Sequence, residues 1–199
     1  METVILQKKR HPGPELFKEL LRKTPVILAV KSMEGLEICL AKDCGIIFIL
    51  FGDIVTIPGI VAKIKEAKKI AMVHMDLIDG LASKDIAVDF LAGQTRADGV
   101  LSTKPSLVKY AKHRELLTIQ RFFVLDSLSL LNIEKQFPLE YADAIEILPG
   151  VMPKIIRKIT ENSKKPIIAG GLISDQEDVR HALNAGAVSV STTNIGLLS

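Results

Sequence analysis

Short runs of apolar residues recur along the chain about every 19 to 28 residues, and a stretch with helical spacing follows each run. The runs are rich in Ile, Val and Phe and have the length of buried strands. They cover residues 26–30, 46–51, 70–74, 99–101, 118–122, 144–147, 167–169 and 187–190. Strands that alternate with helices at this spacing form βαβ units, so the pattern predicts a parallel sheet.

Eight such units favour a compact α/β fold, a (β/α)8 barrel of the TIM type, with an additional helix at about residues 14–23 before the first strand. The chain of 199 residues is short for a barrel that usually has about 250, and too few residues follow the eighth strand for a full last helix. We therefore expect a truncated last helix. Because no linker or low-complexity segment interrupts the pattern, we predict one domain over 1–199, with its barrel at about 25–194. An open doubly wound sheet is the alternative.

The composition is that of a soluble globular protein, with 48% hydrophobic and 25% charged residues. No apolar run approaches the roughly 18 to 20 residues that a membrane span needs, and the N-terminus lacks the features of a signal peptide. We therefore expect a cytoplasmic protein without a membrane partner. Cys39 and Cys44 lack the spacing of a metal or redox motif and are interpreted as structural thiols.

The net charge of +3 is too small to indicate a nucleic-acid-binding protein by itself. Several basic runs occur, and solvated outer faces of helices account for any single one of them. The chain has no Trp and only two Tyr, so the composition does not predict aromatic stacking on bases.

Polar residues follow the predicted strands, whereas the loops that enter strands are short and plain. In a (β/α)8 barrel the ligand site lies at the carboxyl ends of the strands. Because successive side chains of a strand alternate, one parity predicts an interior that is apolar at the start and polar at the end. These residues are Ile27, Ala29 and Lys31; Ile47, Ile49, Phe51 and Asp53; Met72, His74 and Asp76; Val100, Ser102 and Lys104; Ala144 and Glu146; Ile168 and Gly170; and Val190 and Thr192. On the fifth strand, Gln120 and Arg121 compete for the inward direction.

Two glycines, Gly170 and Gly171, follow the seventh strand and allow the backbone to approach a ligand closely. Ser174 and Glu177 have the spacing of a capping box, so a helix should begin here and offer its free amides to an anion. Tight strand-to-helix packing is the alternative explanation of the glycines. The loops after strands seven and eight form the usual phosphate site of such barrels. The loop after the eighth strand adds the candidates Thr192, Thr193 and Asn194.

Charged residues at the other strand ends have two possible roles each. Lys31 and Lys104 are candidates to neutralise a phosphate dianion, or to form structural ion pairs with Glu146 or Asp53. Glu146 ends a buried strand, so its carboxylate must be paired or bound to a ligand. It suits an acceptor for ligand hydroxyls and, equally, a general base.

Three residues near the third strand, His74, Asp76 and Asp79, raise the question of a metal site. Only His74 and Asp76 share a strand face, so we favour hydrogen-bonded polar residues at the barrel mouth and predict no metal or cofactor. Arg121 is expected to pair with Asp126 or to contact phosphate or RNA.

Six segments together resemble the glycerol uptake operon antiterminator family, in the same order from about residue 25 to residue 194. They are HMDLIDGL at 74–81, GVLSTK at 99–104, IQRFFVLDS at 119–127, AIEILPGVMPK at 144–154, AGGLI at 169–173 and STTN at 191–194. The resemblance implies a barrel-like bacterial cytoplasmic regulator that responds to glycerol-3-phosphate. It also implies action on the leader mRNA of glycerol genes, so that transcription passes a terminator.

The resemblance thus favours a regulator that binds its effector without transforming it. One alternative is a barrel enzyme of the aldolase or isomerase type acting on a small phosphorylated substrate, with Lys104 or Glu146 in the chemistry. Another is a ligand sensor whose partner is a protein or a second copy of itself, as a homo-oligomer.

Overall fold

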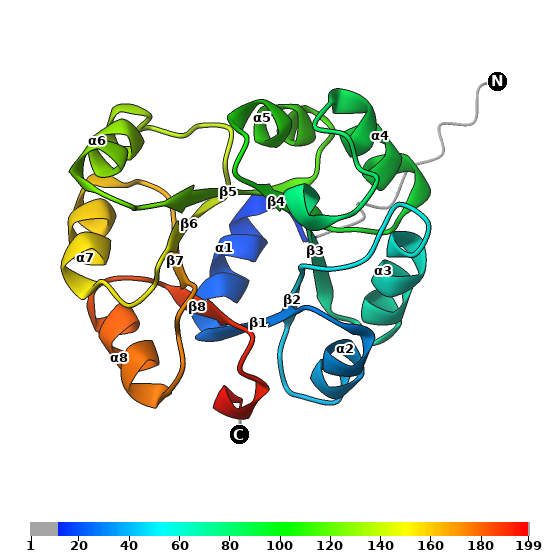
Figure 1. Ribbon diagram of the computed structural model, residues 1–199, viewed down its shortest axis with the longest axis horizontal. Coiled ribbons are helices and arrows are strands. Elements are labelled where there is room, and N and C mark those ends of the chain that lie inside the picture. The colour runs from blue at the N-terminus through cyan, green and yellow to red at the C-terminus, as the bar shows by residue number, and fades with distance from the viewer. Residues whose placement is uncertain (1–11, 199) are drawn as a thin grey trace.

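The computed structural model describes residues 12–198, in which eight parallel strands close into a barrel (Figure 1). Each strand is hydrogen-bonded to the next, and β8 pairs with β1. The strands are β1 (Val26–Val30), β2 (Ile46–Ile49), β3 (Ile70–His74), β4 (Gly99–Ser102), β5 (Leu117–Phe123), β6 (Ala144–Leu148), β7 (Ile167–Gly170) and β8 (Ser189–Thr192). The predicted barrel is confirmed, and the open sheet is excluded.

Helices connect the strands and surround the barrel (Figure 1). They are α2 (Met33–Leu40), α3 (Ile57–Glu66), α4 (Asp85–Gln94), α5 (Pro105–His113), α6 (Ser127–Lys135), α7 (Pro153–Asn162) and α8 (Gln176–Asn184). A 3-10 turn, η1 (Met75–Leu77), follows β3, and up to residue 198, where the described part ends, β8 is followed by a second 3-10 turn, η2 (Ile195–Leu197), and no α-helix. None of the described helices has the length and apolar character needed to cross a membrane.

The leading helix α1 (Pro14–Lys23) lies within the ring of strands in Figure 1 and closes the amino-terminal end of the barrel. Its apolar face carries Phe17 and Leu21, one turn apart, and both are fully buried in the interior cluster. Ser189 at the start of β8 donates hydrogen bonds to the carbonyl oxygens of Leu21 (2.6 Å) and Thr24 (2.8 Å). These bonds add acceptor contacts to carbonyls at the end of the helix, where few intrahelical donors are available. The amino-terminal end of the barrel is therefore filled by packing.

Two carboxylates stabilise the same end of the barrel. Asp98, which precedes β4, accepts hydrogen bonds from the Ala71 amide (2.8 Å) and from Lys65 (2.6 Å). Asp143, which precedes β6, accepts in the same way from the Thr118 amide (3.0 Å) and from a lysine of α5. Each carboxylate thus links a strand start to its neighbour, and burial is compensated by a backbone donor and a cation.

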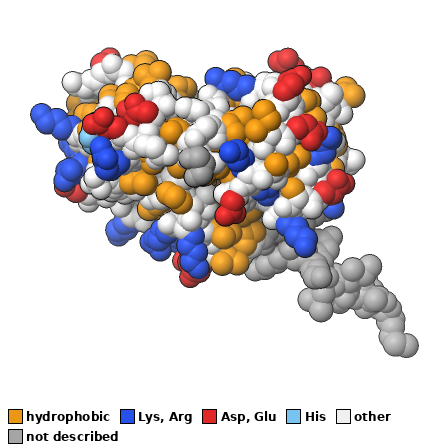
Figure 2. Space-filling view, turned by 90° about the horizontal axis from the view of Figure 1, so that it is seen from below, with side chains coloured by type: hydrophobic (Ala, Val, Ile, Leu, Met, Phe, Trp, Pro, Cys, Tyr) orange, Lys and Arg blue, Asp and Glu red, His pale blue; other side chains and the backbone are white. Residues whose placement is uncertain are grey.

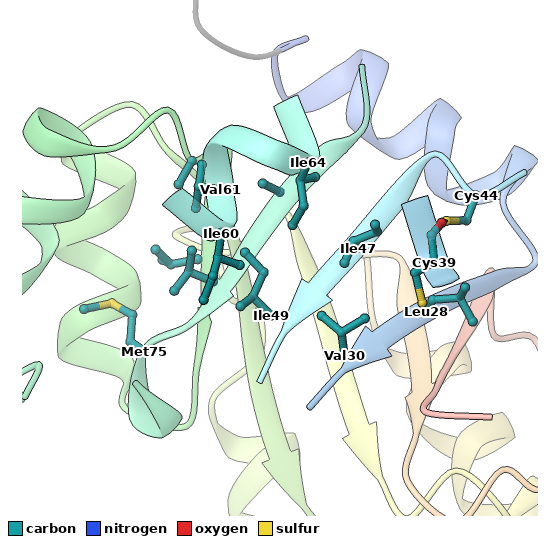
Figure 3. Close-up of a cluster of buried hydrophobic side chains, with 14 of the residues drawn as sticks. Leu28, Val30, Cys39, Cys44, Ile47, Ile49, Ile60, Val61, Ile64 and Met75 are labelled. Carbon is teal, nitrogen blue, oxygen red and sulfur yellow. The ribbon is translucent and has the colours of Figure 1, made fainter. Parts of the chain in front are cut away.

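The interior cluster shows which side of each strand faces inward. The predicted parity is correct for β1, β3, β6 and β7, and Arg121 is the inward residue of β5. It is wrong for β2, β4 and β8, where Phe48, Leu101 and Ser191 point inward. The predicted interior residues of those strands that instead face the helices are Ile47, Ile49, Val100 and Val190. Figure 3 shows Ile49 beside Ile60 of α3.

The error in parity has a physical reason. In a parallel barrel both sides of a strand are buried, so β2 reads Ile-Ile-Phe-Ile with no polar position to mark a face. The alternation of apolar and polar residues, which identifies the buried face of an exposed sheet, is absent there. The inward residues are then decided by the register with the neighbouring strands.

Candidate functional site

A buried ion pair lies at the carboxyl ends of β5 and β6. Arg121 donates from Nε to Oε2 of Glu146 at 2.6 Å, and the two residues are register partners. Glu146 is fully buried and Arg121 is 7% exposed. The predicted pairing of Arg121 with Asp126 is wrong, because the Asp126 carboxylate caps α6 through the Ser129 amide (2.7 Å). Arginine at an inward strand position reaches the carboxylate of the next strand instead.

Ser191 and Gly170 complete this site from β7 and β8. The Ser191 hydroxyl donates to Oε1 of Glu146 at 2.5 Å. A Cβ added to Gly170 would lie 2.5 Å from Ser191 Oγ and 2.6 Å from Glu146 Oε1. Glycine at 170 is therefore required because the Glu146 carboxylate and the Ser191 hydroxyl occupy the space of a side chain. Arg121, Glu146, Gly170 and Ser191 are called the buried network below.

His74, at the end of β3, is the fourth polar residue directed into the barrel. It is 2% exposed, and its Nδ1 has no hydrogen-bond partner within residues 12–198. Burial, followed by the positive charge of Arg121, lowers the pKa of His74 to about 4. The imidazole is therefore neutral at pH 7, and its Nδ1 lies 3.9 Å from the nearest carboxylate oxygen of Asp76. A neutral imidazole with an unused nitrogen can accept or donate one hydrogen bond.

Asp76 belongs to η1 rather than to the strand, and it connects the ends of β3 and β4. It accepts hydrogen bonds from the Ser102 hydroxyl (2.9 Å), the Thr103 amide (2.7 Å) and the Thr103 hydroxyl (3.1 Å). The amide of Lys104 bonds in turn to Ser102 Oγ at 3.0 Å. These contacts give Asp76 a role in holding the loop. No group of three metal-binding side chains occurs in the part of the chain that the structure describes.

The glycine loop after β7 has an unusual backbone. Gly171 and Leu172 both adopt the left-handed conformation, with φ of 75° and 61°. The Gly171 carbonyl accepts from the Gly150 amide at 2.9 Å, which joins the loop to the connection between β6 and α7. Within residues 12–198, the amides of Gly171 and Leu172 donate no hydrogen bond. Free, adjacent amides in a left-handed turn form an anion-binding concavity.

The helix after this loop begins one residue later than predicted. Asp175, not Ser174, caps α8 and accepts from the amides of Glu177 and Asp178, each at 2.9 Å. Ser174 donates both its amide and its hydroxyl to the carboxylate of Asp178. The predicted capping box of Ser174 and Glu177 is therefore wrong. Aspartate is an equally good cap, and the Ser-Asp pair offered two alternatives that spacing alone does not separate.

The loop after β8 is tied to the glycine loop. Thr192 Oγ1 donates to the Ile173 carbonyl at 2.9 Å, and Asn194 Nδ2 donates to the Ser174 carbonyl at 2.8 Å. Thr192 thus faces outward and serves as a connector, contrary to the predicted parity. Thr193 lies exposed between them, and its amide donates no hydrogen bond within the described chain.

The two candidate lysines lie on opposite sides of the mouth. Lys31 directly follows β1, the neighbour of β8, and its side chain has no partner among the described residues. Lys104 follows β4, four strands away from β8, and its Nζ contacts Ser83 Oγ and lies 3.9 Å from Asp76. Neither lysine pairs with Glu146 or Asp53 in this structure.

Asp53, the remaining candidate, stabilises its own loop. It accepts from the amides of Val55 and Thr56, each at 2.8 Å, and forms an isolated bridge with Asp79. The candidates therefore separate into three groups. The buried network and His74 point into the barrel, the loops after β7 and β8 lie above them, and Asp53, Asp76 and Lys104 belong to the opposite rim. Sequence reasoning did not place Ser191 in the barrel interior, because it assigned the inward direction to Thr192.

Comparisons with known proteins agree with the fold and identify the family. A model of the family described as glycerol-3-phosphate responsive antiterminator matches residues 26–198. An uncharacterized Escherichia coli (strain K12) protein, YgcP, is 47% identical over 178 residues, which is 89% of this chain and 93% of that protein.

Two solved structures are similar in fold and sequence. The glycerol uptake operon antiterminator regulatory protein of Listeria monocytogenes has a TM-score of 0.82 at 32% identity, covering 86% of this chain and 93% of that one. A glycerol uptake operon antiterminator-related protein of Thermotoga maritima has a TM-score of 0.77 at 29% identity, covering 88% and 98%. Barrel enzymes at 18% identity or lower share the fold alone.

Proposed function

Because the chain belongs to the glycerol-3-phosphate responsive antiterminator family, a family of regulators, we propose that it binds glycerol-3-phosphate at the barrel mouth without transforming it. The observation that carries this proposal is the buried network beneath the glycine loop. It places hydrogen-bonding groups for hydroxyls below a set of free amides suited to a phosphate. The effector would span the two.

The phosphate is assigned to the side of the mouth formed by β7, β8 and β1. Among the described residues, the amides of Gly171, Leu172 and Thr193 have no acceptor, and the ammonium of Lys31, which directly follows β1, has no partner. Each helix-end or backbone contribution to an anion is worth only about 0.3 to 1 kcal/mol, so several donors and a cation must act together. We assign Asn194 to holding the loop, through Ser174.

The glycerol part is assigned to Glu146, Arg121 and His74. A carboxylate accepts from a hydroxyl, and a neutral imidazole can accept from one hydroxyl at its unused nitrogen. Ser191 and Gly170 position Glu146 for this contact. Asp53, Asp76 and Lys104 shape the opposite rim.

The geometry also argues for a role without chemistry. A general base must be free to take a proton, whereas the Glu146 carboxylate accepts from Arg121 and Ser191 on its two oxygens. A lysine that forms a Schiff base is activated by a desolvated pocket or a neighbouring cation, whereas the side chain of Lys104 is 45% exposed and contacts Ser83. We therefore favour a regulator over an aldolase or isomerase.

As a regulator, the protein is proposed to act in the cytoplasm on leader mRNA, with the effector shifting it toward an RNA-binding state. A nearly complete switch requires about 5.5 kcal/mol of differential affinity between the two states. Titration of a glycerol-gene leader transcript with and without glycerol-3-phosphate tests this part. An RNA affinity that does not respond to the effector contradicts it, and sizing with and without effector would reveal a self-associating sensor instead.

Calorimetry with glycerol-3-phosphate, glycerol and inorganic phosphate in parallel tests the effector site. We expect glycerol-3-phosphate to bind far more tightly than either fragment. Lys31→Gln should lower the affinity for glycerol-3-phosphate and for phosphate by about tenfold, which corresponds to roughly 1.4 kcal/mol for the loss of one charged contact. Lys104→Gln is the matched control on the opposite rim and should change affinity little. Equal losses in both variants would contradict the placement of the phosphate.

A further inference from the structure

Charge is distributed unevenly between the barrel mouth and one flank of the molecule. In the loops that leave the strands and in the first turns of the helices after them, acidic side chains outnumber basic ones. The acidic residues there are Glu34, Asp53, Asp76, Asp79, Asp85, Asp126, Asp175, Glu177 and Asp178, and the basic ones are Lys31, Lys84, Lys104 and Lys154. A polyanion such as RNA would be repelled by most of this rim.

Basic residues gather elsewhere. Figure 2 views the molecule from the side of α8 and the C-terminal segment, and Lys and Arg side chains lie at its left margin and along its lower edge. Exposed basic residues also occur along α7, beginning with Lys154 at the edge of the rim, in the loop that follows α7 and at the end of α1. We call this set the basic stripe, and it consists of Lys154, Arg157, Lys164, Arg22 and Lys23.

The stripe combines two elements that are far apart in the sequence and are linked through β8. Lys164 lies in the loop that enters β7, whose Ile168 is the register partner of Ser189 in β8. The Ser189 hydroxyl bonds to the carbonyls of Leu21 and Thr24, which flank Arg22 and Lys23 at the end of α1. The end of α1 thus lies beside the start of β8, the strand that pairs with β7.

The five side chains of the stripe form no ion pair or hydrogen bond within residues 12–198. Nearby cations are neutralised, as Lys158 is by Glu134 at 3.0 Å and Lys18 by Glu15 at 2.6 Å. Helix α7 has one acidic residue, Glu161, which is exposed and forms no ion pair within residues 12–198. The stripe therefore carries surplus positive charge that the fold does not use.

We propose that the basic stripe is the RNA-binding surface and that it takes the phosphate backbone of an RNA duplex, such as the stem of a leader hairpin. This inference rests on the proposed function. Lys and Arg neutralise phosphates, whereas recognition of single strands needs aromatic side chains for stacking. The only aromatic residue among the exposed large hydrophobic side chains of the described chain is Phe123, at the end of β5. The stripe thus offers charge without a stacking platform.

The stripe is attached directly to the proposed effector site. Helix α7, which carries Lys154 and Arg157, is the helix that follows β6 and its buried Glu146. In the connection between them, the Gly150 amide donates to the Gly171 carbonyl of the glycine loop at 2.9 Å. A Cβ on Gly150 would lie 3.0 Å from backbone atoms of Ala169 and Gly170. An effector that displaces the glycine loop must therefore displace the start of α7.

The experiment compares two triple variants of the full chain. Lys154→Gln/Arg157→Gln/Lys164→Gln removes charge from the stripe. Lys68→Gln/Lys84→Gln/Arg96→Gln removes the same charge from exposed residues around α3 and α4, on the opposite side of the barrel in Figure 1. The probes are a synthetic RNA hairpin with a stem of about 16 base pairs and an unstructured RNA of equal length. Affinity is measured from low salt to 0.2 M, with and without glycerol-3-phosphate.

The stripe variant should lower the slope of log affinity against log salt by about 3, since each phosphate contact contributes roughly 0.9. Its affinity for the hairpin should fall on the order of 100-fold at 0.15 M salt, while the control triple changes it less than about threefold. Effector affinity measured by calorimetry should stay unchanged in both variants.

Three results would overturn the inference. If both triple variants lower the affinity for the hairpin equally, or neither lowers it, the stripe is not the RNA-binding surface. In that case a wild-type RNA affinity that depends on the effector would still support the proposed function. If the wild type binds the unstructured RNA more tightly than the hairpin, the proposal that the stripe binds a duplex is wrong. If the wild type binds neither RNA with or without effector, the proposed function itself fails.

Discussion

The buried pair of Arg121 and Glu146 allows a sharp test of whether this site serves stability or binding. The perturbation has three parts. Arg121→Met and Glu146→Leu each remove one partner, and the double variant replaces both by apolar side chains of similar length. Because the partners are 7% and 0% exposed, solvent cannot compensate for a lost partner.

The expected magnitudes follow from that burial. Removing one partner leaves a buried charge at the end of a 2.6 Å contact, and such changes cost about 3 to 5 kcal/mol of unfolding free energy. In Glu146→Leu, the Ser191 hydroxyl also loses its acceptor, which adds about 1 kcal/mol. In the double variant no charge remains, and comparable replacements elsewhere are neutral or stabilising by about 1 to 4 kcal/mol. The double variant should therefore be more stable than either single variant.

Urea unfolding followed by circular dichroism measures these free energies, and calorimetry with glycerol-3-phosphate measures binding. We expect the double variant to recover at least most of the wild-type stability and to show no effector binding. Single variants within about 1 kcal/mol of the wild type would refute the burial argument. A double variant that is as unstable as the worse single variant would show that the pair holds the barrel together. Retained binding in the double variant would remove the network from the effector site.

Three further changes follow from the same geometry. Gly170→Ala places a Cβ against Ser191 and Glu146, so it should cost about 1 to 3 kcal/mol in urea unfolding and abolish effector binding; normal binding would contradict the crowding argument. His74 has a folded pKa of about 4, below its ordinary 6.5, so the unfolded state binds the proton more readily as pH falls through this interval. The unfolding free energy should therefore fall by about 3 kcal/mol in total between these two pKa values. His74→Gln should lose this part of the pH dependence, and an unchanged slope of unfolding free energy against pH would contradict the reasoning. Leu172→Gly should stabilise by about 1 kcal/mol because Leu172 is 73% exposed at a φ of 61°, whereas Leu172→Ala keeps the strain and should not.

Much of the barrel can be predicted from the sequence because the pattern of an apolar run followed by a helical stretch is repeated. Eight apolar runs separated by helical patterns survive an error of one or two residues at any single boundary, such as the predicted start of β8 at 187 rather than 189. The leading helix was predictable from Pro14 and the one-turn spacing of Phe17 and Leu21. That this helix fills the end of the barrel was not, because nothing local distinguishes an interior partner from an exterior one.

The sequence predicts which strand ends contribute residues to the candidate site, but not which side chains contact one another there. Polar residues at strand ends mark the mouth, and Gly170, Glu146 and His74 do converge there. Which of Gln120 and Arg121 turns inward depends on the register Arg121↔Glu146, a contact between residues 25 positions apart. Likewise, Ser191 rather than Thr192 faces Glu146 because Gly170 is the register partner of Ser191. These are long-range properties that a periodic pattern within one strand does not contain.

Buried carboxylates at the two ends of the barrel have different hydrogen-bond donors, and this difference argues that the mouth is built to bind a ligand. At the amino-terminal end, the Asp98 and Asp143 carboxylates each accept from a backbone amide of the neighbouring strand as well as from a lysine. Such an arrangement connects strands and has an evident structural benefit. At the carboxyl end, the bonds to Glu146 within residues 12–198 come from side chains alone, and Nδ1 of His74 lacks a partner.

The buried polar groups at the carboxyl end contribute little to the stability of the fold, since apolar replacements would pack as well. It also forces a glycine at position 170 and burial of His74 as a neutral imidazole, both of which cost stability. A chain under selection for stability alone would fill this space with apolar side chains, as it does in the rest of the interior around Phe48, Leu101 and Ile119. A bound polar molecule that completes the hydrogen bonds of His74 and Glu146 supplies the missing stabilisation by mass action. Effector binding should therefore raise the unfolding free energy of the wild type, and it should leave that of the apolar double variant unchanged.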